Sequence, residues 1–371
     1  MNTLGMAVTM LVFYIILLGG HFFIYFSLIR FFNVEKNNIK IWMAVALFIS
    51  STGFILSSII AHYSGNAFTR ALYSVSSMWL AVGWNLVMVF SVSWMVVWIA
   101  KAVGKSLDYK CLAVVSLVFT FVFSTYGIWN ASNPKIKNVT IGIKNLPEEW
   151  RGKKAVQLSD IHLGHVYGKK FLASIVEKTN AENPDIVFIT GDLFDGMDGR
   201  LDSLVGPLND IKALDGTYFV TGNHETYLGV ENALSVLKNT PVKILNNEMA
   251  DVAGMQVLGI SYPQRGESMD IKSKIGEIKN FNPGKPSILL YHNPSEAKNA
   301  GEVGVSLQLA GHTHKGQLFP FQLITWLIYG KYHFGLSVDR DFSIYTSSGA
   351  GTWGPAMRTS GRPEIVVINF K

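Results

Sequence analysis

The distribution of hydrophobic residues divides this chain into two parts. Four apolar stretches precede residue 130, and each approaches the roughly 20 residues that a helix needs to cross a lipid bilayer. They run approximately over residues 6–29, 39–62, 74–100 and 112–129. We therefore expect a transmembrane domain of four helices over residues 1–130. A buried helical domain of a soluble protein is the alternative, and a cleaved signal peptide would account for the first stretch alone.

After residue 130 the apolar runs become short. A half-exposed first strand is expected at 135–143, followed by runs at 155–158, 186–189, 218–220, 288–290 and 307–309, with amphipathic helices at 169–180, 201–211 and 230–238. This alternation predicts an α/β domain over residues 131–371. Later runs at 243–245, 255–260, 343–346 and 364–370 lack intervening helices. We expect them to form a second, more antiparallel sheet, which completes a two-sheet sandwich flanked by helices.

Five polar blocks follow the five short apolar runs, each within a few residues. In chain order they are Asp160-Ile-His162, Gly191-Asp192-Leu-Phe-Asp195, Gly222-Asn223-His224-Glu225, Tyr291-His292-Asn293 and Gly311-His312-Thr-His314. They gather carboxylates, an amide and imidazoles without a thiolate, and such ligands bind Mn, Fe or Zn. Because α/β sheets carry their ligands at the carboxyl ends of strands, the pattern predicts a two-metal hydrolase.

Composition and charge support a membrane protein. The 371-residue chain is 49% hydrophobic, its mean hydropathy is +0.26, and its net charge is +6. Much of the basic excess lies beside the apolar stretches, where anionic lipid head groups attract it, so we expect a bilayer as partner and no nucleic acid. The single cysteine, Cys111, allows no internal disulfide and excludes neither compartment.

The loops between the apolar stretches predict an orientation. Six basic residues occupy the first and third loops, and three occupy the opposite side: Arg30, Lys36, Lys40, Lys101, Lys105 and Lys110 against Arg70, Lys135 and Lys137. This bias favours cytoplasmic first and third loops. We therefore expect the second domain on the periplasmic or extracellular side of a bacterial inner or plasma membrane, although Lys135 and Lys137 beside the membrane argue the other way.

The order and content of the five blocks resemble the calcineurin-like metallophosphoesterases, whose pattern is D-x-H, G-D-x-x-D, G-N-H-[ED], a lone His and G-H-x-H. The resemblance covers about residue 135 to the C-terminus. The segment Ser347 to Pro355 resembles the tail of one branch of that family, which includes membrane-anchored and exported bacterial enzymes, UDP-2,3-diacylglucosamine pyrophosphatases and animal transmembrane members.

The resemblance implies a role for each block. Asp160, His162, Asp192 and His314 would hold one divalent metal ion, and Asp192, Asn223, His292 and His312 the other. Asp192 would bridge the two ions, which we expect to be Mn, with Fe or Zn as alternatives. His224 would be the catalytic residue that stabilises the transition state or protonates the leaving oxygen. The Asp195 carboxylate would orient and charge His224.

For several residues the sequence allows both a functional and a purely structural role. Glu225 and Asn293 are candidates to support the metal ligands, or ordinary turn residues, and His165 either reaches substrate or lies on an exposed loop. Three arginines, Arg340, Arg358 and Arg362, are candidate phosphate contacts or surface ion-pair residues. The apolar segment 318–334 is either a shelf that dips into the membrane interface or a core helix.

Together these features predict a membrane-embedded, dinuclear phosphohydrolase that cleaves a phosphoester or pyrophosphate bond, with a lipid-linked substrate. The alternatives are a UDP-2,3-diacylglucosamine pyrophosphatase on the cytoplasmic face and a non-catalytic phospholipid sensor. The sequence leaves the substrate, the metals and the oligomeric state open.

Overall fold

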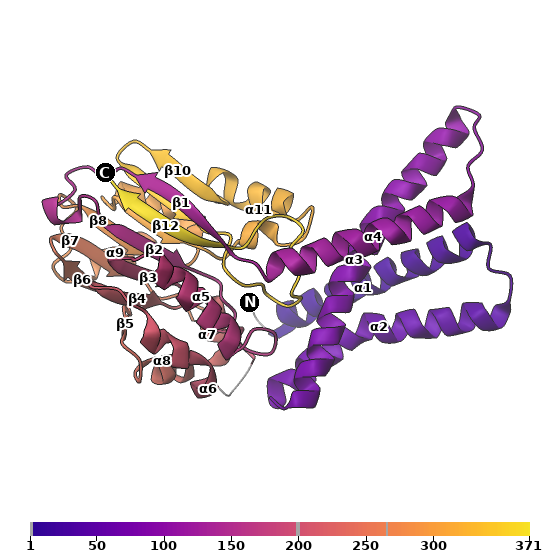
Figure 1. Cartoon of the computed structure of the whole chain (residues 1–371), viewed down its shortest axis with the longest axis horizontal. Helices are drawn as coiled ribbons and strands as arrows, with labels where there is room; N and C mark the ends of the chain where they lie inside the picture. The colour runs from indigo at the N-terminus through magenta and orange to yellow at the C-terminus, as the bar shows by residue number, and fades with distance from the viewer. Residues whose placement is uncertain (1–2, 198–200, 265) are drawn as a thin grey trace. The chain divides into compact units, whose positions relative to one another are not determined.

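The computed structural model describes residues 3–197, 201–264 and 266–371 (Figure 1). The chain forms two compact units, which are described separately below. The first comprises Met1–Trp129 together with Gly354–Thr359, and the second comprises Asn130–Trp353 together with Ser360–Lys371. A short segment near the C-terminus therefore groups with the N-terminal helices.

The first unit contains four long helices, each long and apolar enough to cross a membrane. They are α1 (Thr3–Phe32), α2 (Asn37–Tyr63), α3 (Ala67–Ala102) and α4 (Tyr109–Ala131). Helix α3 begins seven residues before the predicted stretch because a capping box starts it. The Asn66 side chain accepts a hydrogen bond from the Thr69 N–H at 3.0 Å, and the Thr69 hydroxyl accepts one from the Asn66 N–H at 3.1 Å.

The surface of the helical unit is apolar, whereas polar side chains pair in its interior. Trp42 and Phe121 are each more than 70% exposed, while His21 and Asn85 are buried. His21 Nδ1 donates to the Leu17 carbonyl at 2.8 Å, so its Nε2 accepts from the Trp79 indole at 3.0 Å. A soluble helical domain would show the reverse distribution. The arrangement therefore supports the membrane interpretation over the soluble one.

The segment Gly354–Thr359 packs against the helices of its own unit. The Arg358 N–H donates to the Gly127 carbonyl in α4 at 2.9 Å. The Asn85 side chain of α3 donates to Met357 Sδ at 3.4 Å. Gly127 leaves the room for this packing, because a Cβ there would lie 2.7 Å from Met357 Cγ. These contacts attach the segment Gly354–Thr359 to the helices.

The second unit is a sandwich of two six-stranded sheets (Figure 1). The first has the order β1 (Lys135–Ile141), β12 (Glu364–Phe370), β2 (Lys154–Leu158), β3 (Ile186–Thr190), β4 (Gly216–Val220) and β5 (Val242–Ile244). The second has the order β10 (Gly335–Asp339), β11 (Phe342–Thr346), β9 (Leu307–Ala310), β8 (Ser287–Leu290), β7 (Met255–Gly259) and β6 (Glu248–Val252). This confirms the predicted two-sheet α/β fold.

Alternating strand residues build three apolar layers. Phe188 in β3 and Leu309 in β9 belong to the layer between the sheets. The outer face of the first sheet packs against α5 (Lys169–Ala181) and α8 (Val230–Leu237). The outer face of the second packs against α9 (Ile271–Gly276) and α10 (Ala297–Glu302). Both sheets are therefore covered on both faces, as expected for strands that read as continuous apolar runs.

Two details of the prediction are wrong. The later runs do not form their own antiparallel sheet. β5 and β12 join the first sheet, where β12 pairs antiparallel with β2. In the second sheet β7, β8, β9 and β11 run parallel to one another, and antiparallel pairing occurs at the edge strands β6 and β10. The predicted helix over 201–211 is instead the short α6 (Asp202–Val205) followed by a 3₁₀ turn (Gly206–Asp210). Pro207, which lacks an N–H donor, interrupts it.

Candidate metal centre

Each of the five polar blocks begins where a parallel strand ends. Strands β2, β3 and β4 are parallel neighbours in the first sheet, and β8 and β9 are parallel neighbours in the second. Five of the seven predicted ligands have positive φ, between 47° and 73°: Asp160, His162, Asp192, His312 and His314. Such backbone is uncommon for residues other than glycine, and it concentrates at functional sites. These turns bring the blocks together.

Hydrogen bonds connect the blocks across the two sheets. The His312 N–H donates to Asp160 Oδ1 at 3.0 Å, and the Gln157 amide in β2 donates to the Ala310 carbonyl at the end of β9 at 2.8 Å. His292 Nδ1, after β8, lies 2.7 Å from the Thr190 carbonyl at the end of β3. The relative position of the two sheet edges is therefore set by buried polar contacts as well as by the apolar layer.

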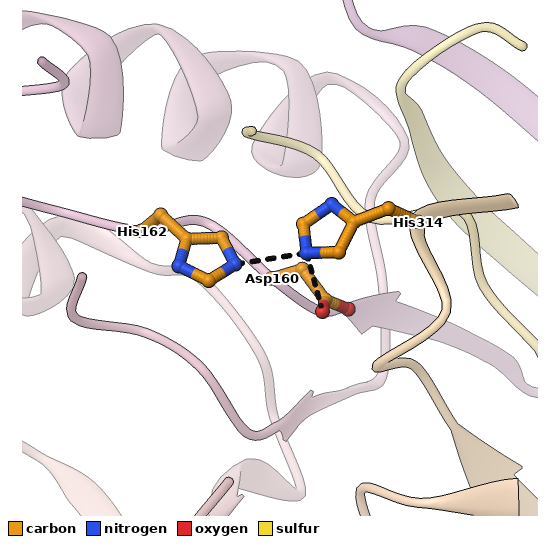
Figure 2. Close-up of side chains that lie close together, drawn as sticks. All are labelled: Asp160, His162 and His314. Atoms are coloured by element: carbon orange, nitrogen blue, oxygen red, sulfur yellow. Dashed lines mark hydrogen bonds and ion pairs between the residues drawn. The ribbon is translucent and has the colours of Figure 1, made fainter. Parts of the chain in front are cut away.

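Asp160, His162 and His314 form one candidate metal cluster (Figure 2). His162 Nε2 lies 3.0 Å from His314 Nε2, which lies 3.2 Å from Asp160 Oδ1. All three residues are buried. Two imidazole nitrogens and a carboxylate oxygen therefore face one another in a site sheltered from water, a donor set that suits a divalent cation.

Asp192, His292 and His312 form a second candidate cluster beside the first. His292 Nε2 lies 3.0 Å from Asp192 Oδ2. Because the Thr190 carbonyl can only accept, His292 Nδ1 carries a proton, and its Nε2 is left for a cation. His312 Nδ1 lies 2.8 Å from Asn223 Oδ1, which brings the amide of the third block to this cluster.

Asp192 connects the two clusters. Its Oδ2 lies 3.9 Å from His162 Nε2 of the first cluster, in addition to its contact with His292 of the second. Ligand atoms of His162, Asp192 and His224 also lie within 4.8 Å of one another. All seven residues that the resemblance implies as ligands thus lie in two adjacent groups, with Asp192 between them.

The charges of this buried site hold a proton where a cation would bind. Burial alone would lower the pKa of His292, but Asp192 and Asp160 raise it to about 10. Burial would raise the pKa of Asp192, but His292 holds it well below its usual range. Burial and the His292 charge lower the pKa of His312 to about 3. One imidazolium therefore compensates the carboxylates, which is a role that divalent ions would fill.

Glu225 holds the main chain of two of the polar blocks in place. It is fully buried, and its carboxylate accepts hydrogen bonds from the N–H groups of Asp192 at 3.0 Å, Gly222 at 2.6 Å and Phe194 at 3.1 Å. It therefore joins the second and third blocks. Asn293 instead follows the turn interpretation, because its side chain accepts from the Ser295 N–H and caps a 3₁₀ turn.

The contact between Asp195 and His224 differs from the prediction. His224 Nδ1 lies 2.6 Å from the main-chain carbonyl of Asp195. The Asp195 carboxylate accepts from the N–H groups of His165 and Met197, each at 3.0 Å. The main chain of Asp195, and not its carboxylate, therefore orients His224, a distinction that residue spacing does not contain. His165 is buried in this loop and not exposed.

The three candidate phosphate arginines lie in different places. Arg340 occupies the turn between β10 and β11, before β11 begins, at the opposite end of that parallel strand set from His312. Arg358 is fully buried in the segment that groups with the helices. Arg362 is exposed shortly before β12, which pairs antiparallel with β2, so it lies at the end of the first sheet where the first block begins. Only Arg340 is therefore placed at the wrong end of its strands, and a phosphate contact stays a prediction for Arg358 and Arg362.

The glycine-rich tail 347–355 passes directly beside the first block. The N–H groups of Ala350 and Gly351 donate to the carbonyls of Ser159 and Asp160 at 2.9 and 2.8 Å. A Cβ on Gly351 would lie 2.1 Å from the Ile161 carbonyl oxygen, so only glycine fits. The tail thus supports the turn that presents Asp160.

Aromatic side chains surround the imidazoles, and two of them, Tyr329 and Trp353, lie in the segments 318–334 and 347–355 that the sequence analysis had singled out. Tyr227 and Trp353 lie with ring centroids 5.2 and 6.4 Å from the ring of His224, and both are more than half exposed. Tyr262 and Tyr329 each lie 6.1 Å from the ring of His312. Tyr227 and Tyr262 were not predicted, although Tyr227 follows His224 by three residues.

Comparisons with known proteins agree with this geometry. Residues 153–316 match the family model described as calcineurin-like phosphoesterase. An uncharacterized metallophosphoesterase from Campylobacter jejuni is 36% identical over 261 residues, which are 69% of each chain. A transmembrane protein with metallophosphoesterase domain from Danio rerio is 37% identical over 70% of this chain and 62% of that protein. An uncharacterized Helicobacter pylori metallophosphoesterase is 37% identical over 64% of each.

Metal binding should release protons. At pH 7 the metal-free site keeps a proton on His292, whose pKa is about 10, and a metal ion must displace it. We expect Mn²⁺ titrations by calorimetry, in buffers of different ionisation enthalpy, to show release of about one proton. The apparent affinity should rise about tenfold per pH unit below that pKa. Heats that do not vary with the buffer would contradict this account.

Replacing Glu225→Gln should weaken metal binding without removing a ligand. Gln offers one acceptor oxygen where the carboxylate serves three N–H donors, so the Asp192 turn loses support. We expect metal affinity to fall about 10- to 100-fold, the range typical for groups that support metal ligands. The matched control is Glu231→Gln, an exposed residue of α8. Equal affinities for both variants in a metal titration would exclude this role.

Proposed function

Because this chain belongs to the calcineurin-like phosphoesterase family, we propose that it is a membrane-bound hydrolase that uses two divalent metal ions to cleave a phosphoester or pyrophosphate bond of a lipid-linked substrate. The family assignment makes the chain a metal-dependent phosphoesterase. The observation that carries the two-metal proposal is the position of buried Asp192 between two clusters of ligand atoms.

The fit of the residues to two metal ions rests on the donor atoms present. Asp160, His162 and His314 would hold one ion, while Asn223, His292 and His312 would hold the other. Asp192 would contact both, because a carboxylate has two oxygens and its charge offsets the repulsion between two cations. Bound divalent ions polarise phosphate oxygens and make water acidic enough to attack near neutral pH. Oxygen and nitrogen ligands of this kind suit Mn, with Fe or Zn as alternatives.

His224 is the candidate proton donor. Its Nδ1 proton is engaged by the Asp195 carbonyl, so Nε2 is the atom available for chemistry. The ligand atoms of His224 and Asp192 lie within 4.8 Å of each other, so the ring adjoins the site where a phosphate would bind. Donation from Nε2 to the leaving oxygen would avoid the release of an alkoxide or a more highly charged phosphate.

The lipid part of the proposal rests on connectivity. Helix α4 ends at Ala131 and β1 begins at Lys135, so Ser132, Asn133 and Pro134 alone separate a candidate membrane span from the catalytic fold. The segment Gly354–Thr359 returns to the helical unit directly after Trp353. Such short connections support an active site that works near a bilayer, which a lipid-linked substrate requires and a freely soluble one does not.

Two alternative functions can be distinguished from this proposal. A UDP-2,3-diacylglucosamine pyrophosphatase would need its nucleotide substrate in the cytoplasm, whereas the charge bias of the loops favours a catalytic domain outside. A reporter fused after Lys371 that is active only outside the cell would exclude that enzyme. A non-catalytic phospholipid sensor is disfavoured by the complete set of candidate ligands together with His224.

Substitutions at the centre should separate metal binding from proton transfer. We expect Asp192→Asn to remove metal from the purified protein and to lower kcat at least 10³-fold. His224→Asn should keep the metal content and lower kcat about 10²- to 10⁴-fold, as loss of a general acid does. The control is His62→Asn, at the end of α2. Wild-type turnover in both site variants, with metal content measured by mass spectrometry, would refute these assignments.

The substrate class can be tested by competition between water-soluble and lipid-linked phosphates. In nanodiscs with Mn²⁺, we expect kcat/KM for lipid-linked phosphate or pyrophosphate compounds to exceed that for soluble nucleotides of the same bond type by at least tenfold. Chelation should abolish both activities. Cleavage of soluble nucleotides alone would overturn the lipid proposal and leave the metal-dependent phosphoesterase intact.

A further inference from the structure

Helix α11 (Gln322–Tyr329) has its polar and apolar faces reversed relative to a helix of a soluble domain. It begins eight residues after His314. The residues that face the rest of the unit are polar or amphipathic. Gln322 Oε1 accepts from the Ser360 hydroxyl at 2.8 Å, and Thr325 Oγ1 lies 3.5 Å from His333 Nδ1. The Tyr329 ring packs against His312.

The opposite face of α11 is apolar and open. Its exposed residues are large, and none of the eight residues of the helix is buried. They are Leu323, Ile324, Trp326, Leu327 and Ile328, exposed by 49–73%. Phe319, just before the helix, is exposed as well. A surface helix normally turns its apolar stripe towards the core, so this helix is built for apolar surroundings outside its own domain. The core-helix interpretation of segment 318–334 is therefore wrong for α11.

We propose that α11 is an interfacial helix that inserts its apolar face into the head-group and upper acyl region of the bilayer, beside the metal centre. Lipid is the occupant because the same chain carries four candidate membrane spans, and three residues separate the last from β1. The composition also fits. Interfacial helices place Trp and Leu in the membrane and keep basic residues at their polar margins. Lys315 and Lys331 flank α11 in the sequence, and Lys331 also pairs with Asp339 at 2.9 Å.

The position of α11 next to the ligands gives the insertion a consequence for catalysis. The ring of Tyr329, the last residue of α11, lies 6.1 Å from the ring of His312, so the C-terminal end of the helix adjoins the second metal cluster. A phosphate at the membrane surface would then reach the ligands without its acyl chains leaving the bilayer. This last step rests on the proposed function, whereas the insertion of α11 does not.

Depth-dependent fluorescence quenching tests the insertion without measuring turnover. In the full chain in nanodiscs, with Cys111→Ser as background, Leu327→Cys and separately Ile328→Cys are labelled with an environment-sensitive dye. The control is Leu214→Cys, at a leucine outside α11 that is 94% exposed. We expect doxyl-labelled lipids to quench the dye at 327 and 328 at least fivefold more than at 214. Aqueous iodide should show the opposite order.

Two outcomes would overturn the insertion. Iodide quenching at 327 and 328 equal to that at 214 would show that the face lies in water. Protection from both iodide and doxyl lipids would show that protein covers it, either the helices of this chain or a second copy. Because neither readout depends on catalysis, an inactive enzyme with an inserted α11 would count against the proposed function only. An active enzyme with α11 in water would count against this inference only.

Discussion

The buried carboxylate of Asp192 is the group on which the rest of the site depends. An unpaired charge in a protein interior is strongly unfavourable, so its surroundings must compensate it. His292 compensates the Asp192 charge directly, and the main-chain N–H of His224 donates to Asp192 Oδ1 at 2.9 Å. Glu225 accepts from the Asp192 N–H and thereby holds its turn. Gly222 is required at close range, since a Cβ there would lie 2.2 Å from Asp192 Oδ1.

The groups around this carboxylate come from two sheets. The first sheet provides Asp160, Asn223 and His162, and the second provides His292, His312 and His314. The turns that deliver them take positive φ at non-glycine residues, which is unfavourable by about 1–3 kcal/mol each and persists only where contacts determine it. The His312 N–H bond to Asp160 and the tail contacts to Ser159 and Asp160 are such contacts.

A second physical theme is reversed polarity, which occurs in both units. In the helical unit, His21 and Asn85 each form a side-chain hydrogen bond in the interior, while aromatic and aliphatic side chains lie on the surface. In the catalytic unit, α11 repeats this arrangement on a small scale, with Gln322 inward and Leu327 outward. Both patterns are stable where the surrounding medium is apolar. The catalytic unit therefore carries an exposed apolar helix of its own, next to the residues that would hold the metals.

The sequence by itself determined the four apolar helices, the α/β class and the list of metal-ligand candidates, because apolar periodicity and block composition are local properties. The prediction of a helix over 201–211 was wrong because Pro207 lacks an N–H donor, and this too is a local property of the sequence. Only the tertiary structure decided which strands share a sheet, because β12 pairs with β2 across most of the domain's sequence, and β5 pairs with the preceding β4 and not with the following β6. It also decided that the main chain of Asp195 orients His224, that Glu225 joins two blocks, and that α11 faces outward. Each depends on the direction of an atom in space, which residue spacing does not encode.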